Sequence, residues 1–507
     1  MVTTCTAYHR LTSYNRYRMS GHTLDWSNQP VVFKDYPGLE VVPLPPAAPA
    51  DQRPGLLQIA VSEWAVPSMA AISLEQLSLV LALAYRLTAR SRHAGGDFFY
   101  RSVPSAGALY PCELYLATRD LPGLPDGLYH YAIGRHGLVR LRSGHFLDSA
   151  APHAQRDRTA PAPAVVFLVT TIFFRSAWKY RARSYRYHLL DSGHLLESLV
   201  LALKAASLPG KVSFDFNDQE VNAFLGCDVG QEGCLAMVDA GAEGDGLHRE
   251  ATAAATRLPE AIQAASRVAS QEVSYPALQE FHEASSRVVE AQLPVPDMIE
   301  AVGQSPVSWH PILAGEAQPE QMSFGEATGR RRSHRNFISE PIPRSTFHAL
   351  ATLLGAPCPP AESWAFLPEQ SIAPGFLVGN VEGLDPGCYW LDRSRLCLGL
   401  TRAGRFLPPM AHSCLDQEWP ERAGLHCFVA ANLEVLDSTW GPRGYRYAML
   451  TAGRLGHRVY LGATAFGLGC CGIGAFYDEE TAALLGLNPA SVMLYLLAVG
   501  PVKRALR

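Results

Sequence analysis

The chain repeats part of its own sequence at a fixed distance of 260 residues. Residues 123–129 read GLPDGLY and residues 383–389 read GLDPGCY, an offset of 383 − 123 = 260. Residues 184–187 read SYRY and residues 444–447 read GYRY, again 444 − 184 = 260 apart. Two separate segments that share one offset predict that two copies of a single fold lie in tandem. We refer to them as copy one and copy two.

Both copies show the same order of apolar patterns. In each, short runs bounded by turn residues read as strands, and a long segment with apolar residues at helical spacing follows a buried strand. This alternation predicts an α+β fold. The predicted helices are 73–90, 187–206, 344–355 and 447–466. The predicted strands are 114–118, 127–132, 138–141 and 164–171 in copy one, and 375–378, 387–391, 396–399, 426–433 and 491–499 in copy two.

The composition of the chain sets the predicted domain boundaries. We assign residues 1–243 to copy one, 244–325 to a joining segment and 326–507 to copy two. The joining segment is rich in Ala, Glu and Gln and then in Pro, and its residues 277–290 have apolar side chains at helical spacing. We therefore predict a helical strap followed by a Pro-containing linker. The Pro-rich residues 41–53 are predicted to form an extended surface arm.

Charge and cysteine content exclude several classes of protein. With 43 Lys and Arg against 47 Asp and Glu, the net charge of −4 argues against a nucleic-acid partner. No run of apolar residues approaches the 18 or so that a membrane helix needs, and the first residues lack the apolar segment of a secretory signal. The eleven Cys show no metal-binding spacing, so we expect no metal site and a reduced, cytoplasmic chain.

Three segments are candidates for chemistry. Residues 330–337 read RRRSHRNF, which suits either a solvated basic run at a helix start or a site for an anion such as phosphate. Residues 101–111 read RSVPSAGALYP, either an ordinary turn or a loop whose small residues admit a flat ligand. Residues 467–478 read GLGCCGIGAFYD, a Gly-rich strand that suits close helix packing or contact with a planar group.

Taken together, these segments resemble those of the nitroreductase-like flavoproteins, and more narrowly the SagB/ThcOx-type dehydrogenases. The similarity lies in PSAGALYP followed by ELYL, in SYRYHLLDSGHLLES, in RRSHRNF and in GLGCCGIGAFYDEE. The resemblance implies two tandem FMN-dependent nitroreductase-like domains, each with an antiparallel or mixed sheet flanked by helices. It also implies flavin sites built across the interface of two copies, which are usually two subunits and here are fused into a pseudo-dimer.

The resemblance assigns the phosphate side of a flavin site to copy two and the ring side to copy one. The implied contacts to the phosphate and ribityl chain are Arg331, Arg332, Ser333 and Arg335, with Lys503 or Arg504 adding a phosphate contact. The implied contacts to the isoalloxazine are Gly474 and Ala475 from copy two, and Pro104, Ser105, Ala106 and Ala108 from copy one.

Each copy departs from the family pattern in one half of its site. Copy one has HRLTSY at 9–14, which places Tyr14 where copy two has Arg335, and it has Phe214 and Asp215 in place of small residues. Copy two has WAFLP at 364–368 in place of the Pro-Ser loop. Because each copy keeps only one half, we expect one FMN per chain, bound in a single composite pocket.

The candidate catalytic residues are Lys179 and Tyr180, which precede the long helix of copy one. In azoline-oxidising relatives a Lys-Tyr pair at this place is implicated in proton transfer, which accompanies hydride transfer to FMN. The alternative is that Lys179 is solvated and Tyr180 packs. Arg186 and Arg446 recur at equal positions of the repeat, which favours a structural salt bridge at the interface over a ligand contact. His194 is expected to be structural.

The predicted function is therefore an FMN-dependent oxidoreductase that acts on a small molecule or a peptide-derived heterocycle. No GxGxxG motif follows a strand, so NAD(P)H, if used, would bind transiently over the flavin. A second possibility is flavin-consuming chemistry. The alternative from another class is a non-catalytic flavin-fold scaffold that presents peptides to modification enzymes.

Overall fold

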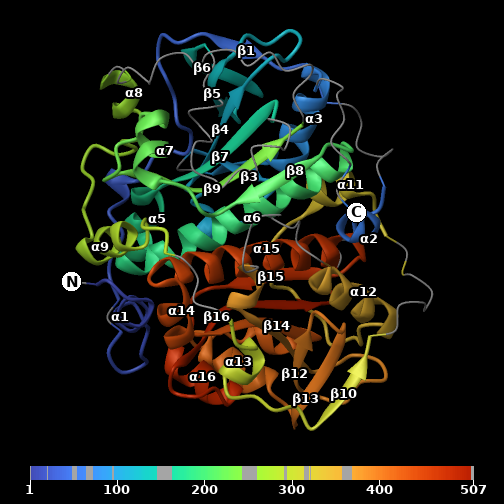
Figure 1. Cartoon of the computed structure of the whole chain (residues 1–507). Coiled ribbons are helices and arrows are strands. Elements are labelled where there is room, and N and C mark those ends of the chain that lie inside the picture. The colour runs from blue at the N-terminus through green and yellow to red at the C-terminus, as the bar shows by residue number, and fades with distance from the viewer. Residues whose placement is uncertain are drawn as a thin grey trace.

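The computed structural model shows two stacked halves, with copy one (blue to green) above copy two (yellow to red) and two long helices between them (Figure 1). The α+β class and the two tandem domains are as predicted. None of the described helices has the length and apolar character that a membrane span requires. The structure describes residues 2–19, 21–47, 54–63, 65, 72–93, 96–144, 163–241, 258, 260–289, 294–312, 319, 321–356 and 368–503.

Each half contains a seven-stranded sheet, and the two sheets have the same topology. The strand orders are β1-β6-β5-β4-β7-β9-β8 and β10-β13-β12-β11-β14-β16-β15, with antiparallel neighbours throughout. In copy one the strands are β1 (Val41–Pro43), β4 (Cys112–Thr118), β5 (Gly127–Ala132), β6 (Gly137–Ser143), β7 (Val165–Ile172), β8 (Gly210–Ser213) and β9 (Glu232–Ala240). In copy two they are β10 (Ser308–Pro311), β11 (Ala373–Val378), β12 (Gly387–Asp392), β13 (Cys397–Ala403), β14 (Leu425–Asn432), β15 (Gly469–Ile473) and β16 (Ser491–Gly500).

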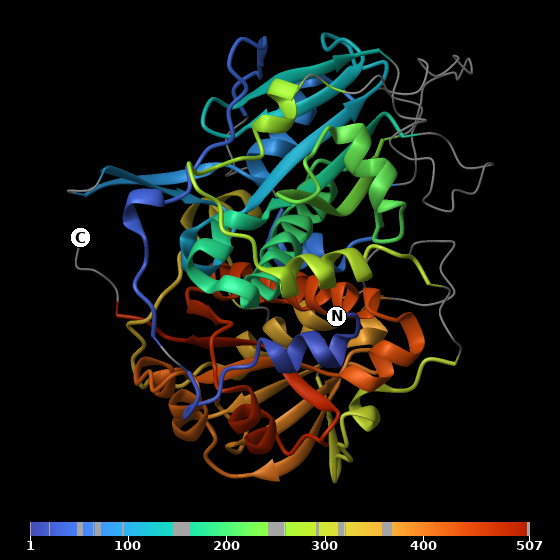
Figure 2. The same cartoon turned by 90° about the vertical axis from the view of Figure 1, so that its left-hand side faces the viewer.

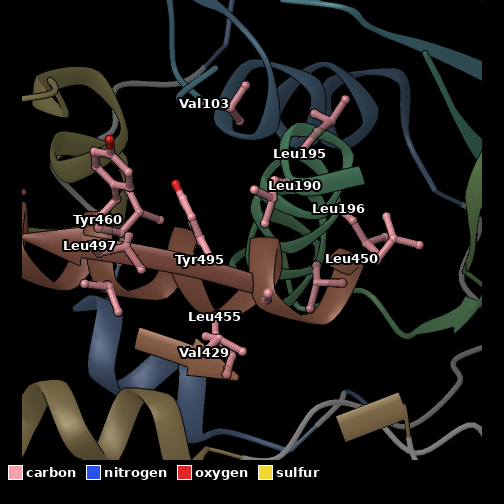
Figure 3. Close-up of a cluster of buried hydrophobic side chains, with 14 of the residues drawn as sticks. Val103, Leu190, Leu195, Leu196, Val429, Leu450, Leu455, Tyr460, Tyr495 and Leu497 are labelled. Carbon is pink, nitrogen blue, oxygen red and sulfur yellow. The ribbon is translucent and has the colours of Figure 1, made fainter. Parts of the chain in front are cut away.

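The two halves meet where α6 (Ser184–Ala205) crosses α15 (Arg443–Ala465), and both helices are almost wholly buried. Gly193 and Gly453 occupy the crossing at equivalent positions of the repeat. A Cβ on Gly193 would lie 2.2 Å from the carbonyl oxygen of Leu450, and one on Gly453 would lie 2.3 Å from that of Leu190. The two backbones therefore touch, and leucines of both helices gather around the contact (Figure 3).

Shorter helices flank this central pair in a matching arrangement. α3 (Leu74–Ala84) packs on α6, and α12 (Arg344–Gly355) packs on α15. α2 (Leu56–Val61) contacts α6 and α12, while α11 (Phe324–Arg330) contacts α15 and α3. Further helices are α5 (Phe173–Tyr180), α7 (Asp218–Leu225), α8 (Glu260–Ala264), α10 (Met298–Ala301), α13 (Leu407–Ser413), α14 (Leu433–Trp440) and α16 (Asp478–Leu485).

The first helix of each copy packs against the other copy. α1 (Cys5–Leu11) packs on α14 and lies among the orange and red elements of copy two (Figure 2). α9 (Pro276–Ala284) packs on α6 of copy one. The rings of Tyr8 and Phe281 stack at 4.4 Å between centroids. α9 therefore corresponds to α1, and both α9 and the edge strand β10 belong to the second unit, although they lie within 244–325.

Four arginines fix the interface through two equivalent clusters, each with one carboxylate and two arginines. Arg183 and Arg186 lie 2.7 and 2.6 Å from the carboxylate of Asp478. Arg443 and Arg446, 260 residues later, bind Asp218 in the same way. All six side chains are buried. The expected structural role of Arg186 and Arg446 is confirmed.

Three local predictions differ from the structure. The helix expected over 277–290 ends at Ala284. The helix expected over 73–90 ends at Ala84, and β2 (Leu87–His93) pairs with β3 (Gly96–Arg101) in a hairpin. Tyr85 already has extended backbone angles, and the pairing with β3 is a long-range contact that local periodicity does not report. Of the extended arm expected over 41–53, the first three residues form β1, and residues 48–53 lie outside the described residues.

Candidate functional site

The basic segment of copy two runs beside β15. Ser333 forms a parallel bridge with Cys470, and the His334 N–H donates to the Cys470 carbonyl oxygen at 2.9 Å. Further on, the Lys503 N–H donates to the Asn336 carbonyl oxygen at 3.1 Å. These pairings place the exposed side chains of Arg335 and Lys503 on neighbouring backbone segments. Arg504 lies outside the described residues.

Arg331 joins this segment to copy one. Its guanidinium is buried, and Nε donates to the Ser102 carbonyl oxygen at 2.7 Å, while Nη2 donates to the Arg101 carbonyl oxygen at 3.0 Å. Nη1 has no hydrogen-bond partner among the described residues. Burial lowers the pKa of Arg331 from its ordinary value. The basic segment and the Pro-Ser loop, which begins two residues after Ser102, are therefore adjacent, as the composite pocket requires.

The other members of the basic segment differ in how far contacts within the protein hold their side chains. Arg332 donates to the Thr88 side chain and backbone at 3.2 and 3.3 Å, so the β2–β3 hairpin holds it. Ser333 is exposed, and its hydroxyl lies 3.0 Å from that of Tyr460. The Tyr460 hydroxyl also accepts a hydrogen bond from the backbone N–H of Gly472 at 2.6 Å. Ser333 thus remains accessible while its orientation is fixed.

The cations of this segment lack acidic partners in the described part of the chain. No carboxylate there lies within 4.0 Å of Arg331, Arg332, Arg335 or Lys503. Other buried guanidinium groups of this protein, such as those of Arg183 and Arg443, do pair with carboxylates. Uncompensated cations beside an accessible hydroxyl group form a site suited to an anion.

The loop of copy one opposite this segment is held from below by Asp191 on α6. Ser105 Oγ donates to Asp191 Oδ2 at 2.5 Å, and the Ala106 N–H donates to Asp191 Oδ1 at 3.2 Å. Ser105 Oγ also accepts from the Tyr110 N–H at 2.9 Å. Pro104 is buried, whereas Ser105, Ala106 and Ala108 are half-buried. The loop thus presents its small residues on a fixed backbone.

A buried polar cluster holds the far end of the same loop. Arg175 donates from Nη1 to the Tyr110 carbonyl oxygen at 3.1 Å and to Glu113 at 2.5 Å, and His130 lies 2.8 Å from the same carboxylate. Burial alone would raise the pKa of Glu113, but Arg175 and His130 outweigh it and lower that pKa. The residues 260 positions later in copy two are apolar: Ala373, Trp390 and Val435.

Lys179 and Tyr180 end α5 and lie against the tip of the loop. A Cβ on Gly107 would lie 2.7 Å from the Tyr180 hydroxyl and 3.4 Å from Lys179 Nζ. Gly107 also has φ +64, a conformation that suits glycine. Both candidate catalytic side chains are half-buried. The structure therefore brings them together with the Pro-Ser loop.

Tyr187 links these residues to the Gly-rich strand of copy two. Its ring lies 4.5 Å from that of Tyr180, and its hydroxyl donates to the Gly474 carbonyl oxygen at 3.1 Å. A Cβ on Gly474 would lie 2.5 Å from the Tyr187 ring, and Ala475 beside it is half-buried. Burial raises the pKa of Tyr180, Tyr187 and Asp191 act in the same direction, and Arg335 opposes them. Groups from both copies thus act on one tyrosine.

We call this arrangement the composite site. It consists of residues 331–335, Gly474, Ala475 and Lys503 of copy two with 104–108, Lys179 and Tyr180 of copy one. No group of three or more His, Cys, Asp or Glu side chains suited to a metal ion occurs in the described part of the chain.

Tyr14 does not occupy the position in copy one that corresponds to Arg335, so that expectation is wrong. It pairs with Tyr477 of copy two, its N–H donates to Asp478 at 2.7 Å, and its ring lies 4.1 Å from the Arg183 guanidinium carbon. The counterpart of α11 is α2, at an offset of 324 − 56 = 268. At that offset residues 62–67, SEWAVP, correspond to residues 330–335, RRRSHR. Copy one therefore lacks the basic motif, and Tyr14 borders the composite site.

The equivalent position on the other side of the interface is filled by side chains. Phe214 is buried, with its ring 6.4 Å from that of Tyr447. The Tyr447 hydroxyl donates to Asp215, which also lies 3.4 Å from Arg443 Nε. Asp215 is therefore compensated by a cation within the protein. Residues 364–367 of copy two, which should face this position, lie outside the described residues.

Several residues that support the composite site were not found from the sequence. No partner for Asp191 or Glu113 could be named, because both partners are distant in the chain. Tyr187 carried a usable signal, since it recurs as Tyr447 in the repeat. His194 is buried with Nε2 3.0 Å from the Tyr495 hydroxyl, as expected for a structural role. The hydroxyl groups of Tyr495 and Tyr460 point in the same direction (Figure 3).

The fold and this site define a nitroreductase-type protein. The model described as Nitroreductase family matches residues 68–241 and 382–501, and the chain belongs to this family. A nitroreductase-like protein of Anabaena variabilis of known structure superposes with a TM-score of 0.76 over 98% of this chain and 99% of its own, at 25% identity.

Among curated proteins, the nitroreductase-like MJ1384 of Methanocaldococcus jannaschii is 32% identical over 30% of this chain and 74% of its own length. The trifolitoxin-processing protein TfxB of Rhizobium leguminosarum bv. trifolii is 32% identical over 31% of this chain. The microcin B17-processing protein McbC of Escherichia coli is 28% identical over 25%. The chain spans 44% of TfxB and 49% of McbC, so it is similar to about half of each.

Proposed function

We propose that this protein is an FMN-dependent oxidoreductase of the SagB/ThcOx-like or nitroreductase type, with one FMN per chain in the composite site. The observation that carries the proposal is the contact of Arg331 with the Arg101 and Ser102 carbonyl groups, because it brings the two intact half-motifs together. The family membership supports an oxidoreductase in general, and the composite site supports the flavin.

The residues of the composite site fit FMN. Uncompensated Arg335 and Lys503, with the accessible Ser333 hydroxyl, suit a phosphate group. The small side chains of the 104–108 loop suit the close approach of a flat ring. Gly474 lets the Tyr187 ring lie against the backbone of copy two, which places an aromatic group beside the proposed ring position. A phosphate clamp of this kind also favours FMN over FAD, since an adenylate would need space beyond it.

Lys179 and Tyr180 are the groups proposed to handle protons. When bound, FMN supplies the hydride chemistry. Lys179 Nζ, at the tip of the loop, takes a proton from the substrate or returns one to it. The Tyr180 hydroxyl, whose pKa is raised by burial, stays protonated and orients the substrate or Lys179. NAD(P)H serves as a transient reductant if the reaction runs as a reduction.

The proposed substrate is a small molecule or a peptide-derived heterocycle. Support for a peptide comes from TfxB and McbC, which are both named as processing proteins of peptide products. We include a cytoplasmic setting in the proposal, because the ten described cysteines are all free thiols. Nucleic acid and membrane are not among the proposed partners.

The direct test is the flavin content of the purified full chain after incubation with FMN. The proposal predicts yellow protein that bleaches under dithionite and holds about one FMN per polypeptide. A ratio near two would contradict the single site, and colourless protein that cannot be reconstituted would favour the scaffold. Arg335→Ala should weaken FMN binding, whereas Arg395→Ala, which removes an exposed arginine of copy two paired with Asp392, should not.

Rapid-reaction kinetics on the reconstituted protein distinguish between the proposed classes of substrate. Reduction of the bound flavin is followed at its absorption band after mixing with NADH, NADPH or azoline-containing peptides. Fast reduction by an azoline identifies a dehydrogenase, and fast reduction by a nicotinamide identifies a reductase. A flavin that none of these reduces would argue against both forms of the proposal.

A further inference from the structure

Asp191 differs from the other buried carboxyl groups of this protein. It is 5% exposed, and its two oxygens accept hydrogen bonds only from Ser105 and Ala106 in the described part of the chain. No cationic side chain described in the structure lies within 4.0 Å of it. The other buried carboxylates each have a cation: Glu113 has Arg175, Glu197 has Arg454 and Arg458, Asp218 has Arg443 and Arg446, Glu232 has Lys34, and Asp478 has Arg183 and Arg186.

Burying a carboxyl group without a cation is unfavourable, so its position requires a reason. The reason visible in the structure is the loop. Asp191 accepts hydrogen bonds from Ser105 and Ala106, and Ser105 Oγ in turn accepts one from the Tyr110 N–H. One carboxyl group therefore holds both ends of the 105–110 turn in place. Copy two has Thr451 at the equivalent position, buried and without a hydrogen-bond partner among the described residues. Of the two equivalent positions, only the one in the copy that has the Pro-Ser loop carries a carboxyl group.

The surroundings of Asp191 are those of the composite site. The titratable groups that sense its charge are Tyr180 from α5, Tyr495 from β16 and Cys112 from β4. Burial raises the pKa of Asp191 to about 7, and the hydrogen bonds from Ser105 and Ala106 oppose this shift. The charged and ionisable side chains nearby are Lys179 at the loop tip, Arg331 at its start, Arg335 beside Tyr180, and His194 one turn further along α6.

We propose that Asp191 is a positioning residue, which holds Ser105 and Ala106 in the conformation that faces the flavin and makes the flavin's reduction potential depend on its charge. The effect on the reduction potential rests on the proposed function. The positioning of the loop does not, because the contacts of Asp191 with Ser105 and Ala106 exist in the chain itself. A negative charge near the ring opposes the addition of electrons, so a charged Asp191 lowers the potential and a neutral side chain raises it.

The first experiment needs no flavin. Hydrogen exchange of the Ala106 and Tyr110 amides is measured in the apoprotein, in Asp191→Thr, which installs the residue of copy two, and in Asp191→Asn. The Thr variant should exchange both amides about tenfold faster or more, because it loses a charge-assisted acceptor. Asp191→Asn should stay near the parent, since its amide oxygen can accept from the Ala106 N–H while its amide nitrogen donates to Ser105 Oγ. Thr451→Ala is the matched control and should leave these amides unchanged. Equal exchange in parent and Thr variant would overturn the positioning role.

The second experiment measures the midpoint potential of bound FMN between pH 5.5 and 8.5. The parent should show a bend near pH 7 as Asp191 ionises, whereas Asp191→Asn should have a higher potential above pH 7 and no bend there. Identical potential curves would overturn the electrostatic role. Asp191→Asn keeps the loop contacts, so this arm stands even if the Thr variant does not fold. Failure of the parent to bind FMN would instead contradict the proposed function, while the exchange data would still judge the loop.

Discussion

Arg331 of copy two donates a hydrogen bond from Nε to the carbonyl oxygen of Ser102 in copy one, at 2.7 Å and across 229 residues of sequence. The contact is buried, and a second bond to Arg101 accompanies it. Arg331 therefore acts first as a link between the two halves of the composite site. Of its three nitrogens, only Nη1 has no partner among the described residues and could meet a ligand.

Replacing Arg331 with Met tests this link. The change leaves two buried carbonyl oxygens without donors, so we expect the free energy of unfolding to fall by about 1–3 kcal/mol. FMN affinity should fall as well, because the loop loses its contact with copy two. Urea denaturation and FMN fluorescence titration measure the two effects. Arg395→Ala is the control and should change stability by less than about 0.5 kcal/mol. A variant with parental stability and affinity would contradict the role of Arg331 as a link.

Gly107→Ala tests the packing of the loop tip against the candidate catalytic residues. The new Cβ would lie 2.7 Å from the Tyr180 hydroxyl, and the residue has φ +64. The matched control is Gly38→Ala, where φ is +82 and no atom lies within 4 Å of a Cβ. Both variants carry a backbone cost of about 1 kcal/mol. Only Gly107→Ala should also slow turnover, because it displaces Tyr180. Equal kinetics in the two variants would contradict the contact.

The two interface carboxylates offer a comparison between the sides of the pseudo-dimer. Burial alone would raise the pKa of Asp478, but Arg183 and Arg186 outweigh it and lower the pKa well below the usual value. A lowered carboxyl pKa stabilises the fold above about pH 4, and this stabilisation is lost as the pH falls further. Asp478→Asn and Asp218→Asn should each cost about 3–5 kcal/mol, because each leaves two buried guanidinium groups uncompensated.

Flavin binding should separate these two variants. Arg183 also donates to the Gly474 carbonyl oxygen at 3.0 Å, so the Asp478 cluster supports the composite site. Asp218 supports the position filled by Phe214 and Asp215. We therefore expect weaker FMN binding in Asp478→Asn and parental binding in Asp218→Asn. Binding is measured without urea, at a temperature at which both variants are folded. Equal loss of flavin in both would indicate that the two sides are functionally alike.

Local signals in the sequence located the two long central helices and the middle strands of both sheets. The strand predicted over 127–132 and the helix predicted over 344–355 have the observed bounds, because Gly and Pro turns delimit the first and a Pro start and Gly end delimit the second. The repeat also anticipated the paired arginines of the interface. These features depend on residues close together in the chain or on a constant spacing.

The packing of the first helix of each copy against the other copy was not predictable in the same way. Tyr8 corresponds to Phe281, an offset of 281 − 8 = 273, whereas the rest of the repeat keeps 260. Insertions had changed the spacing, and the shared residues are too few to reveal α9 as the partner of α1. The error at Tyr14 followed from the same cause. In the candidate site, the sequence indicated which segments meet but not Asp191, whose role depends on a contact with Ser105.

The raised pKa of Asp191 predicts how stability depends on pH. Burial raises this pKa to about 7, so between about pH 4 and pH 7 the folded state holds a proton that the unfolded state has released. Stability should therefore fall as the pH rises through this range, by at most about 4 kcal/mol. Asp191→Asn lacks this contribution and should gain stability relative to the parent from pH 5 to pH 8 in urea denaturation. A constant difference between the two proteins would contradict the shifted pKa.

Lys179→Ala distinguishes the two interpretations of this residue. If Lys179 Nζ transfers the proton, the variant should bind FMN as the parent does and turn over about 10²–10⁴-fold more slowly. If the side chain is only solvated, the rate should not change. The loss should appear in kcat and in the pH profile, and not in the flavin spectrum. His22→Ala is the control for a change of shape beside Lys179, because it removes a side chain that is hydrogen-bonded to the Lys179 backbone oxygen. Because Lys179 and Tyr180 meet the loop at Gly107, a slow Lys179→Ala with intact flavin would place proton transfer at that tip.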